Sequence, residues 1–501
     1  MAGTAIERVL PDEQATVAFG QDLAAALKPG DLVLLQGDLG AGKTTLARAL
    51  IRAMAADPAL EVPSPTFTLV QTYETRVPLA HFDLYRIAAP EELDELGLDE
   101  ALAAGAALVE WPERAEDRLP SEAVTIRLAD RGEGRLAIIE AAGEALHRIR
   151  RSLDIRDFLD AAGWPLATRA HLTGDASARA YETVSLPGRA DHIVMNAPPL
   201  VPGPPIRDGR TYADIVHTAR TIDAFVAIDH LLASGGIAVP EIAAQDLDRG
   251  LLLISHLGSG NFLDAGEPVA ERYAAAAELL AFLHGRKWPQ AAEAAPGRLH
   301  AIPPFDREAM LIEAELLLDW YLPFARGDGP TPSERQAFVA AWSAAFDRLA
   351  GCEESLVLRD YHSPNLIWRP ERRDRDRLGV IDFQDALVGP AAYDVASLAL
   401  DARVTIAPEF ERATVEAYTA ARGAAGPFDR ASFDRAYAIM GAQRNSKILG
   451  IFVRLDRRDG KPHYLKHLPR IRDYLGRTLV HPALAEVRDL HRRLGIFGDT
   501  P

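Results

Sequence analysis

The chain of 501 residues is poor in cysteine, in lysine and in long apolar runs, and each shortage excludes a class of protein. Its one cysteine, Cys352, excludes an intrachain disulfide and a cysteine-rich zinc site. No segment approaches the roughly 18 consecutive apolar residues of a membrane span, and the first residues show no basic stretch followed by an apolar run. We therefore expect a cytoplasmic protein without a membrane partner, and 48% hydrophobic residues suffice for a packed core.

Positive charge is also scarce, and lysine is the scarcer cation. The formal net charge is −17, and only 6 of the 55 basic residues are lysine. Residues 1–150 hold 14 basic and 25 acidic side chains, a net charge of −11. Such a segment is a poor direct binder of nucleic acid, because phosphate contacts need a basic surface. Partner proteins, or a nucleotide with a metal ion, fit it better.

Residues 1–150 alternate short apolar runs with helical patterns, which predicts an α/β sheet that is partly parallel. The first run is followed by a glycine loop and then by apolar residues at helical spacing. We expect a small nucleotide-binding domain that ends near residue 148. The predicted strands are residues 31–37, 78–85, 106–111, 123–129 and 135–141.

The glycine loop reads GDLGAGKTT and matches the pattern G-x-x-x-x-G-K-[ST]. Backbone N–H groups of such a loop surround phosphates at a helix N-terminus. Lys43 is suited to reach the terminal phosphates and Thr44 to bind Mg²⁺, so ATP or GTP is the expected ligand. The predicted nucleotide-binding residues are Gly37, Asp38, Leu39, Gly40, Ala41, Gly42, Lys43, Thr44 and Thr45.

Two acids end the following predicted strands. Asp83 could hold Mg²⁺, and Glu110 could orient an attacking water. Taken alone, each acid is more simply a solvated strand end, but beside a phosphate-binding loop the functional interpretation is favoured. Ser64 and Thr66 lie between the loop and these acids in a proline-stiffened segment, which we interpret as a switch that responds to the γ-phosphate.

The segments GDLGAGKTT, SPTFTLV, HFDLYR and VEWPE, in this order, resemble the TsaE family over residues 1–148. The resemblance implies the ATPase subunit of the complex that makes threonylcarbamoyladenosine in tRNA. It assigns Lys43 and Thr44 to ATP and Mg²⁺, Asp83 to the metal, and Glu110 with Trp111 to hydrolysis or coupling. It also implies that the other subunits of the complex, and not this acidic domain, contact most of the tRNA.

The remainder of the chain has a different pattern. Residues 149–162 are charged and helical in pattern, without a Pro/Gly/Ser tract, so the junction is short. A β-rich stretch to about residue 256 and a mostly helical remainder follow. We predict domains at 1–148, 149–256 and 257–501, the last two being a small β lobe and a large α lobe.

Residues 356–368, LVLRDYHSPNLIW, carry the spacing of a kinase catalytic loop. Asp360 is suited to accept the proton of an acceptor hydroxyl, and Asn365 with Asp382 to bind Mg²⁺. Two neighbours remain open: His362 is catalytic or a hydrogen-bonding loop residue, and Asp385 is functional or caps a turn.

The β-rich stretch departs from the protein-kinase pattern, because no lysine occurs from residue 44 to 286 to pair with the α- and β-phosphates. The segment TGDASARAY (173–181) takes the place of the phosphate-covering loop, and Arg179 is the cation best placed to substitute. The alternative is an ordinary hairpin.

Residues 149–501 resemble the aminoglycoside phosphotransferase/choline kinase superfamily, through segments that include GDASARAY, RDYHSPNL and IDFQDALVGPAAYDVASL. Within it they look most like the anomeric kinases of N-acetylmuramate and N-acetylglucosamine, with Asn196 where those carry an acid. The expected fold class is therefore α/β, a P-loop NTPase domain followed by a bilobal protein-kinase-like domain. The resemblance implies transfer of the ATP γ-phosphate to the anomeric hydroxyl of an amino sugar in cell-wall recycling.

The leading hypothesis is thus a bifunctional fusion of an ATPase for tRNA modification with a sugar 1-kinase. One alternative makes the N-terminal domain a non-catalytic regulatory or scaffold module. Another gives the kinase an aminoglycoside, a choline-like molecule or a protein as acceptor. The basic segment 444–472 is predicted to be a solvated helix face, although a sugar carboxylate or an RNA backbone is a possible ligand.

Overall fold

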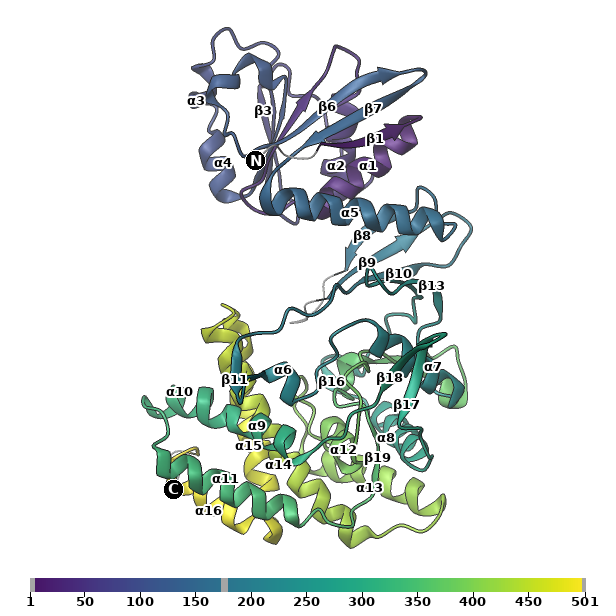
Figure 1. The fold of residues 1–501 in the computed structure, drawn as a ribbon, viewed down its shortest axis with the longest axis vertical. Coiled ribbons are helices and arrows are strands. Elements are labelled where there is room, and N and C mark those ends of the chain that lie inside the picture. The colour runs from purple at the N-terminus through teal and green to yellow at the C-terminus, as the bar shows by residue number, and fades with distance from the viewer. Residues whose placement is uncertain (1–4, 173–178, 498–501) are drawn as a thin grey trace. The chain divides into compact units, whose positions relative to one another are not determined.

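The computed structural model describes residues 5–172 and 179–497 (Figure 1). The chain divides into two compact units, Met1–Ala197 with Ile242–His256, and Pro198–Glu241 with Leu257–Pro501. Among the described residues, no helix combines the length and the apolar character that a membrane crossing needs.

The first sheet of the first unit has seven strands in the order β1-β7-β6-β2-β5-β4-β3. Strands β6, β2, β5 and β4 pair in parallel, which confirms the predicted parallel part, and the other pairs are antiparallel. The five predicted strands correspond to β2 (Leu32–Gln36), β4 (Leu79–Asp83), β5 (Ala106–Glu110), β6 (Val124–Arg131) and β7 (Gly134–Glu140). Two further strands, β1 (Ile6–Leu10) and β3 (Val70–Tyr73), lie at the edges.

Helices cover both faces of this sheet. One core contains residues of α1 (Glu13–Ala26) and α2 (Lys43–Ala55), and the other contains residues of α3 (Glu92–Glu95) and α4 (Leu98–Ala104). Helices α1 and α2 meet at Gly20, where an added Cβ would lie 2.6 Å from the Cβ of Ala49. Only glycine permits this approach, so α1 packs directly on the helix that follows the phosphate-binding loop.

Helix α5 (Gly143–Ala161) contains most of the predicted helical junction and contributes to two hydrophobic cores. Its Ile149 and Leu153 belong to the core of the first sheet. Its Ile155 and Leu159 belong to the core beneath a second, five-stranded antiparallel sheet. That sheet has the order β13-β14-β10-β9-β8, with β8 (Thr168–Leu172), β9 (Ala180–Ser185), β10 (His192–Asn196), β13 (Ile242–Asp246) and β14 (Leu251–Ser255).

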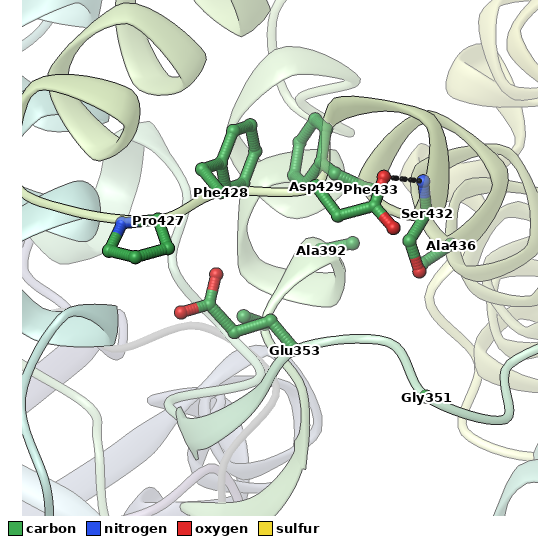
Figure 2. A pocket seen from close by; sticks show the side chains of 10 residues that line it. Gly351, Glu353, Ala392, Pro427, Phe428, Asp429, Ser432, Phe433 and Ala436 are labelled. Carbon is green, nitrogen blue, oxygen red and sulfur yellow. Dashed lines mark hydrogen bonds between the residues drawn. The ribbon is translucent and has the colours of Figure 1, made fainter.

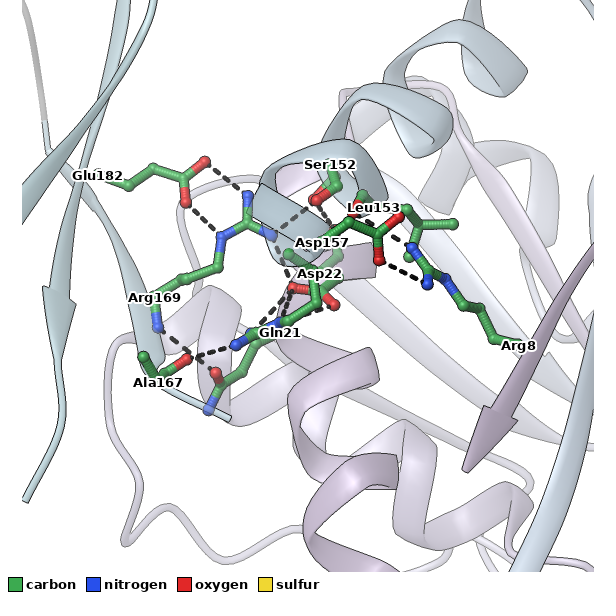
Figure 3. A network of polar contacts seen from close by, with 10 residues as sticks. Arg8, Gln21, Asp22, Ser152, Leu153, Asp157, Ala167, Arg169 and Glu182 are labelled. Atoms are coloured by element: carbon green, nitrogen blue, oxygen red, sulfur yellow. Dashed lines mark hydrogen bonds and ion pairs between the residues drawn. The ribbon is translucent and has the colours of Figure 1, made fainter. Parts of the chain in front are cut away.

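A buried polar network also joins the two sheets (Figure 3). Asp22 of α1 accepts hydrogen bonds from Arg156 of α5 at 3.1 Å and from Arg169 of β8 at 2.6 Å. Arg169 also donates to both carboxylate oxygens of Glu182 on β9, at 2.6 and 2.9 Å. Burial of an unpaired charge is costly, so these charges fix β8 and β9 on α1.

The second unit is mostly helical (Figure 1). Its strands form two-stranded pairs: β11 (Pro205–Arg207) with β12 (Arg210–Thr211), β15 (Leu263–Asp264) with β16 (Glu267–Pro268), β17 (Ala291–Ala295) with β18 (Arg298–Ala301), β19 (Glu354–Val357) with β22 (Leu387–Pro390), and β20 (Leu366–Trp368) with β21 (Leu378–Val380). Its helices are α6 (Tyr212–Ile215), α7 (Asp223–Ser234), α8 (Ala270–His284), α9 (Arg307–Leu316), α10 (Leu322–Arg326), α11 (Pro332–Asp347), α12 (Ala392–Ala399), α13 (Pro408–Ala424), α14 (Arg430–Arg457), α15 (Leu468–Thr478) and α16 (Ala485–Arg493).

A cavity of about 230 Å³ lies between residues 351–353 and the first turns of α12 and α14 (Figure 2). Phe428, Phe433 and Ala436 supply apolar walls, and the nearby Glu353 is paired with Arg422. None of the residues predicted to bind or transfer phosphate lines it. It is therefore not a candidate for either site.

Candidate active sites

The phosphate-binding loop joins β2 to α2 as predicted. Gly37, Gly40 and Gly42 have φ values of 144°, 82° and 101°, a region that favours glycine. A Cβ on Gly37 would lie 2.5 Å from the carbonyl oxygen of Leu128, so this position has no room for a side chain. The other predicted loop residues differ in exposure: Asp38 and Leu39 are exposed, Ala41 is buried, and Thr45 is half-buried.

Lys43 is the first residue of α2, and its ammonium group is held over the loop. Nζ donates to the carbonyl oxygens of Gly37 at 2.6 Å and of Asp38 at 3.0 Å. It also lies 3.6 Å from the ring centroid of Trp111, a cation–π contact. Burial lowers the pKa of Lys43, and Glu110 opposes that shift. Trp111, predicted to act in hydrolysis or coupling, thus contacts the lysine itself.

Glu110 ends β5 and connects the loop to the sheet. Its Oε2 accepts a hydrogen bond from the Thr44 hydroxyl at 2.9 Å, and its Oε1 lies 3.0 Å from Nε2 of His81 on β4. Both Glu110 and His81 are buried. Thr44 is the predicted metal ligand. The carboxylate that it contacts belongs to Glu110 and not to Asp83, which was the predicted metal residue.

Asp83 is paired with Glu110 in the register of the neighbouring parallel strands. Its Oδ2 accepts from the hydroxyls of Ser64 at 2.8 Å and Thr66 at 2.7 Å. Asp83 therefore binds both residues of the predicted switch segment. The predicted switch segment is thus bonded to the strand end that lies beside Glu110.

The second predicted site is built on the loop after β19. Asp394 of α12 is fully buried and accepts from the backbone N–H groups of Leu358 at 2.6 Å and Arg359 at 2.9 Å. Asp401, just beyond α12, accepts from the N–H of Ser363 at 2.9 Å. Two buried acids near opposite ends of one helix thus hold the catalytic loop in place.

Arg359 has a positive φ of 67°, and its guanidinium group is buried beneath the loop. It forms an ion pair with Glu313 of α9, which also binds Lys447 of α14 at 2.7 Å. Burial alone would raise the pKa of Glu313, but the two cations lower it to about 2. The loop is therefore anchored to two helices by buried charges.

Asp360, the predicted catalytic base, is partly exposed beside these cations. Burial would raise its pKa, but Lys447, His362 and Arg359 favour the charged form and lower it. A carboxylate that stays ionised can accept a proton from a hydroxyl. The pKa of His362 is lowered by burial, and its Nδ1 has no hydrogen-bond partner among the described residues.

The predicted metal residues Asn365 and Asp382 are brought together. Asn365 Nδ2 donates to the backbone oxygen of Asp360 at 2.9 Å and to Oδ2 of Asp382 at 3.3 Å. Gln384 donates to Oδ1 of Asp382 at 3.0 Å. Asp385 accepts from the N–H of Ala219 at 2.7 Å, so its carboxylate joins this segment to the residues before α7.

The predicted phosphate-covering segment 173–181 falls partly outside the described residues, because residues 173–178 are not described. Arg179 is described, half-buried, immediately before β9. The segment connects the antiparallel strands β8 and β9, which agrees with either interpretation of it. Asn196 accepts hydrogen bonds from Arg151 of α5 at 2.8 and 3.0 Å, so its amide binds the junction helix.

The basic segment 444–472 does not form one solvated face, and that prediction is wrong for its first residues. Arg444 is buried, and Lys447 is paired with Glu313. Arg457 and Arg458, near the end of α14, are exposed. The reason is that α14 is buried on nearly all sides over its central turns.

Sequence reasoning missed the residues that act through others, chiefly His81, Glu313, Asp394 and Asp401. The only signal available was an acid or histidine inside an apolar run, as in AHFDL and AAYDVASLALD. Such residues are rarely buried unless they have partners.

Both sites offer hard oxygen ligands of the kind that Mg²⁺ prefers. The first has the Thr44 hydroxyl with the carboxylates of Glu110 and Asp83, and the second has Asn365 with Asp382. No group of three or more His, Cys, Asp or Glu side chains among the described residues could hold a metal ion alone. Both sites therefore fit a metal that is bound jointly with nucleotide phosphates.

Comparison with known proteins agrees with this division. Residues 10–137 match the model of the family described as Threonylcarbamoyl adenosine biosynthesis protein TsaE, and residues 168–431 match the Phosphotransferase enzyme family. The chain is 35% identical over 347 residues to the N-acetylmuramate/N-acetylglucosamine kinase of Caulobacter vibrioides, which covers 66% of this chain and 93% of the relative. The Pseudomonas aeruginosa kinase of the same name is also 35% identical, over 66% of this chain and 90% of the relative.

The N-terminal part has relatives of its own. It is 42% identical over 123 residues to the tRNA threonylcarbamoyladenosine biosynthesis protein TsaE of Rickettsia bellii, which covers 24% of this chain and 85% of the relative. Fold and sites thus define a two-part protein, with a P-loop domain followed by a kinase-like phosphotransferase. The chain belongs to the TsaE family in its N-terminal part and to the phosphotransferase enzyme family in the rest, and is a fusion of the two.

Proposed function

We propose that the chain is a bifunctional cytoplasmic enzyme. Its N-terminal domain hydrolyses ATP in support of threonylcarbamoyladenosine synthesis in tRNA, together with the other subunits of that complex. Its C-terminal part phosphorylates the anomeric hydroxyl of N-acetylmuramate and N-acetylglucosamine in cell-wall recycling. The relatives' names support both activities, and the pairing of Thr44 with Glu110 and of Asn365 with Asp382 supports the chemistry.

In the N-terminal half, the loop N–H groups and Lys43 bind the phosphates of ATP. Thr44 and Glu110 would hold a Mg²⁺ ion, which would neutralise phosphate charge, and Asp83 would respond to the nucleotide through Ser64 and Thr66. The acidity of this half supports an indirect role toward tRNA, with the partner subunits contacting the nucleic acid.

In the kinase, Asp360 accepts the proton of the anomeric hydroxyl as its oxygen attacks the γ-phosphorus of ATP. The bond to the β-phosphate oxygen breaks, and ADP leaves. Asn365 and Asp382 would hold a Mg²⁺ ion, which would neutralise charge on the transferred group. Arg179 is the proposed substitute for the missing lysine.

The N-terminal assignment is tested with Lys43→Ala. We expect loss of ATP hydrolysis and of threonylcarbamoyladenosine in cells that depend on this chain. Lys28→Ala is the matched control, because Lys28 is an exposed lysine of the same half. If Lys43→Ala lost ATP hydrolysis but still supported tRNA modification, a scaffold role would be favoured. If Lys43→Ala kept both ATP hydrolysis and tRNA modification at normal levels, the assignment would be refuted.

The kinase assignment is tested by incubating the protein and ATP separately with N-acetylmuramate, N-acetylglucosamine and kanamycin, and then locating the phosphate. We expect sugar 1-phosphates, and a fall of about 10²- to 10⁴-fold in kcat for Asp360→Asn. The exposed Asp376→Asn is the control. Phosphate on kanamycin alone, or full activity of Asp360→Asn, would refute this proposal.

A further inference from the structure

Arg444 of α14 is a buried cation that forms no ion pair with an acid of the described residues. Arg444 is 4% exposed. Among the described residues, its guanidinium group donates one long hydrogen bond, of 3.4 Å, from Nη1 to the carbonyl oxygen of Leu400. It forms no ion pair with any carboxylate of the described residues. Burying a charge without a counter-charge is strongly unfavourable, so such a residue calls for an explanation.

The other buried cations show how unusual this is. Among the described residues, the buried lysines and arginines are Lys43, Arg156, Arg169, Arg359 and Arg444. Arg156 and Arg169 pair with Asp22, and Arg359 pairs with Glu313. Lys43 forms no ion pair, and it is the residue proposed to bind the phosphates of ATP. Arg444 is therefore the second buried cation that forms no ion pair within the described part of the chain.

Arg444 lies beside the catalytic loop. Leu400, its backbone partner, directly precedes Asp401, whose carboxylate holds the N–H of Ser363 within that loop. Its charge acts on both Asp360 and His362, lowering the pKa of each. The acceptor hydroxyl must meet Asp360, so Arg444 is close to the place where the acceptor binds.

The neighbouring cation cannot take the same role. Lys447 lies one turn further along α14, but its Nζ is 2.7 Å from Oε1 of Glu313, which neutralises it. A guanidinium group also suits a carboxylate better than an ammonium group does, because it can donate two parallel hydrogen bonds. Of these two cations, which both act on Asp360, Arg444 is thus the one that forms no ion pair among the described residues.

We propose that Arg444 binds the carboxylate of the acceptor sugar and sets the preference for an acidic sugar over a neutral one. This rests on the proposed sugar-kinase function. N-acetylmuramate carries a lactyl ether, and with it a carboxylate, that N-acetylglucosamine lacks. The two sugars are otherwise the same, so they form a matched pair for a single charged contact.

The test compares kcat/KM for the two sugars in the full-length protein and in Arg444→Gln. We expect a fall of roughly 10- to 100-fold for N-acetylmuramate and little change for N-acetylglucosamine. Arg457→Gln, at an exposed arginine of the same helix, is the control. An equal fall for both sugars, or a raised KM for ATP alone, would overturn the proposal.

A second comparison does not depend on how well the variant folds. N-acetylmuramate whose carboxylate is converted to a carboxamide is compared with the free acid in the wild-type protein. We expect the amide to lose most of the preference over N-acetylglucosamine, and Arg444→Lys to show an intermediate preference. Equal rates for acid and amide would overturn the role of Arg444, whereas failure to phosphorylate either sugar would refute the kinase assignment itself.

Discussion

At the scale of single residues, Glu110 depends on His81 for its position. The imidazole of His81 is fully buried, its Nε2 contacts Glu110, and its Nδ1 has no partner among the described residues. A side chain in this position can orient Glu110, but it does not touch the nucleotide loop. His81 is therefore a positioning residue for the carboxylate that meets Thr44.

Replacing His81 by phenylalanine should separate hydrolysis from binding. We expect the Kd of ATP to change little, because Lys43 and the loop remain, and kcat of hydrolysis to fall about 10-fold as Glu110 loses its support. His81→Asn, which keeps one hydrogen-bonding group, should recover part of the rate. A parallel loss of binding and hydrolysis in both variants would mean that His81 serves only stability.

Asp229 of α7 is an isolated buried acid. It is 3% exposed, and its Oδ2 has no hydrogen-bond partner among the described residues. Burial raises its pKa to about 7 from an ordinary value of 3.8. The folded protein keeps this proton up to about pH 7, whereas the unfolded chain releases it near pH 4. The contribution to stability is therefore complete below about pH 4 and is lost as the pH rises through 7.

The neutral variant Asp229→Asn should remove this dependence. We expect it to be more stable than the wild type at pH 8.5, by up to about 4 kcal/mol, and similar to it near pH 4. Thermal unfolding of both proteins at these pH values measures the difference, because the other groups titrate alike in both. A difference in stability between the two proteins that does not change with pH would contradict the raised pKa of Asp229.

At the scale of elements, α12 acts as a clamp for the catalytic loop through Asp394. Its two carboxylate oxygens each accept from one of two consecutive backbone N–H groups. An amide cannot reproduce this arrangement, because one of its two polar atoms is a donor. We expect Asp394→Asn to lose about 1–3 kcal/mol of stability and at least 10-fold in kinase kcat. The free energy of unfolding and the kinase kcat are both measured for Asp394→Asn and for the wild type.

Asp434→Asn, at a half-exposed acid on α14, is the control for this substitution, and it should change stability and kinase kcat little. Unaltered kcat in Asp394→Asn would show that the loop keeps its geometry without the clamp.

The elements also show what a sequence can predict. The buried parallel strands β2, β4 and β5 are nearly continuous apolar runs, and they were predicted. The edge strands β1 and β3 read IERVL and VQTY, and their polar residues hide the pattern. The predicted site residues of both parts follow local spacings, so a sequence can suggest them, and their catalytic roles stay predictions.

Contacts between distant segments could not be predicted in this way. Glu313 and Arg359 are 46 residues apart, and Glu110 and Thr44 are 66 apart. Arg444 lies in a charged stretch that suggests a solvated face, but burial is decided by the elements packed around α14. A single sequence does not carry that information.

At the scale of the whole molecule, the network around Asp22 makes the five-stranded sheet depend on the TsaE-family domain. Loss of the Asp22 charge would leave Arg156 without an acid and Arg169 with only Glu182. Removing one partner of a buried ion pair costs about 3–5 kcal/mol. A substitution in the ATPase half should therefore weaken the kinase.

Asp22→Asn tests this dependence. We expect a lower thermal midpoint and faster loss of kinase activity on heating, with the rate at low temperature nearly unchanged. Asp12→Asn, at the exposed cap of the same helix, affects only α1 and is the control. Equal heat inactivation of the Asp22→Asn and wild-type kinases would show that the two sheets are stable independently.

Helix α5, with one half in each hydrophobic core, also bears on how the chain is made. The ribosome releases the N-terminal half first, and domains generally fold in that order. Asp22 and the face of α1 are thus present before Arg156 and Arg169 emerge, and the kinase sheet assembles on a surface that is already folded. A kinase produced from residue 143 onward would lack this template, exposing Ile149 and Leu153 to water. If the two parts were made as separate chains, this sheet would need another surface to pack on.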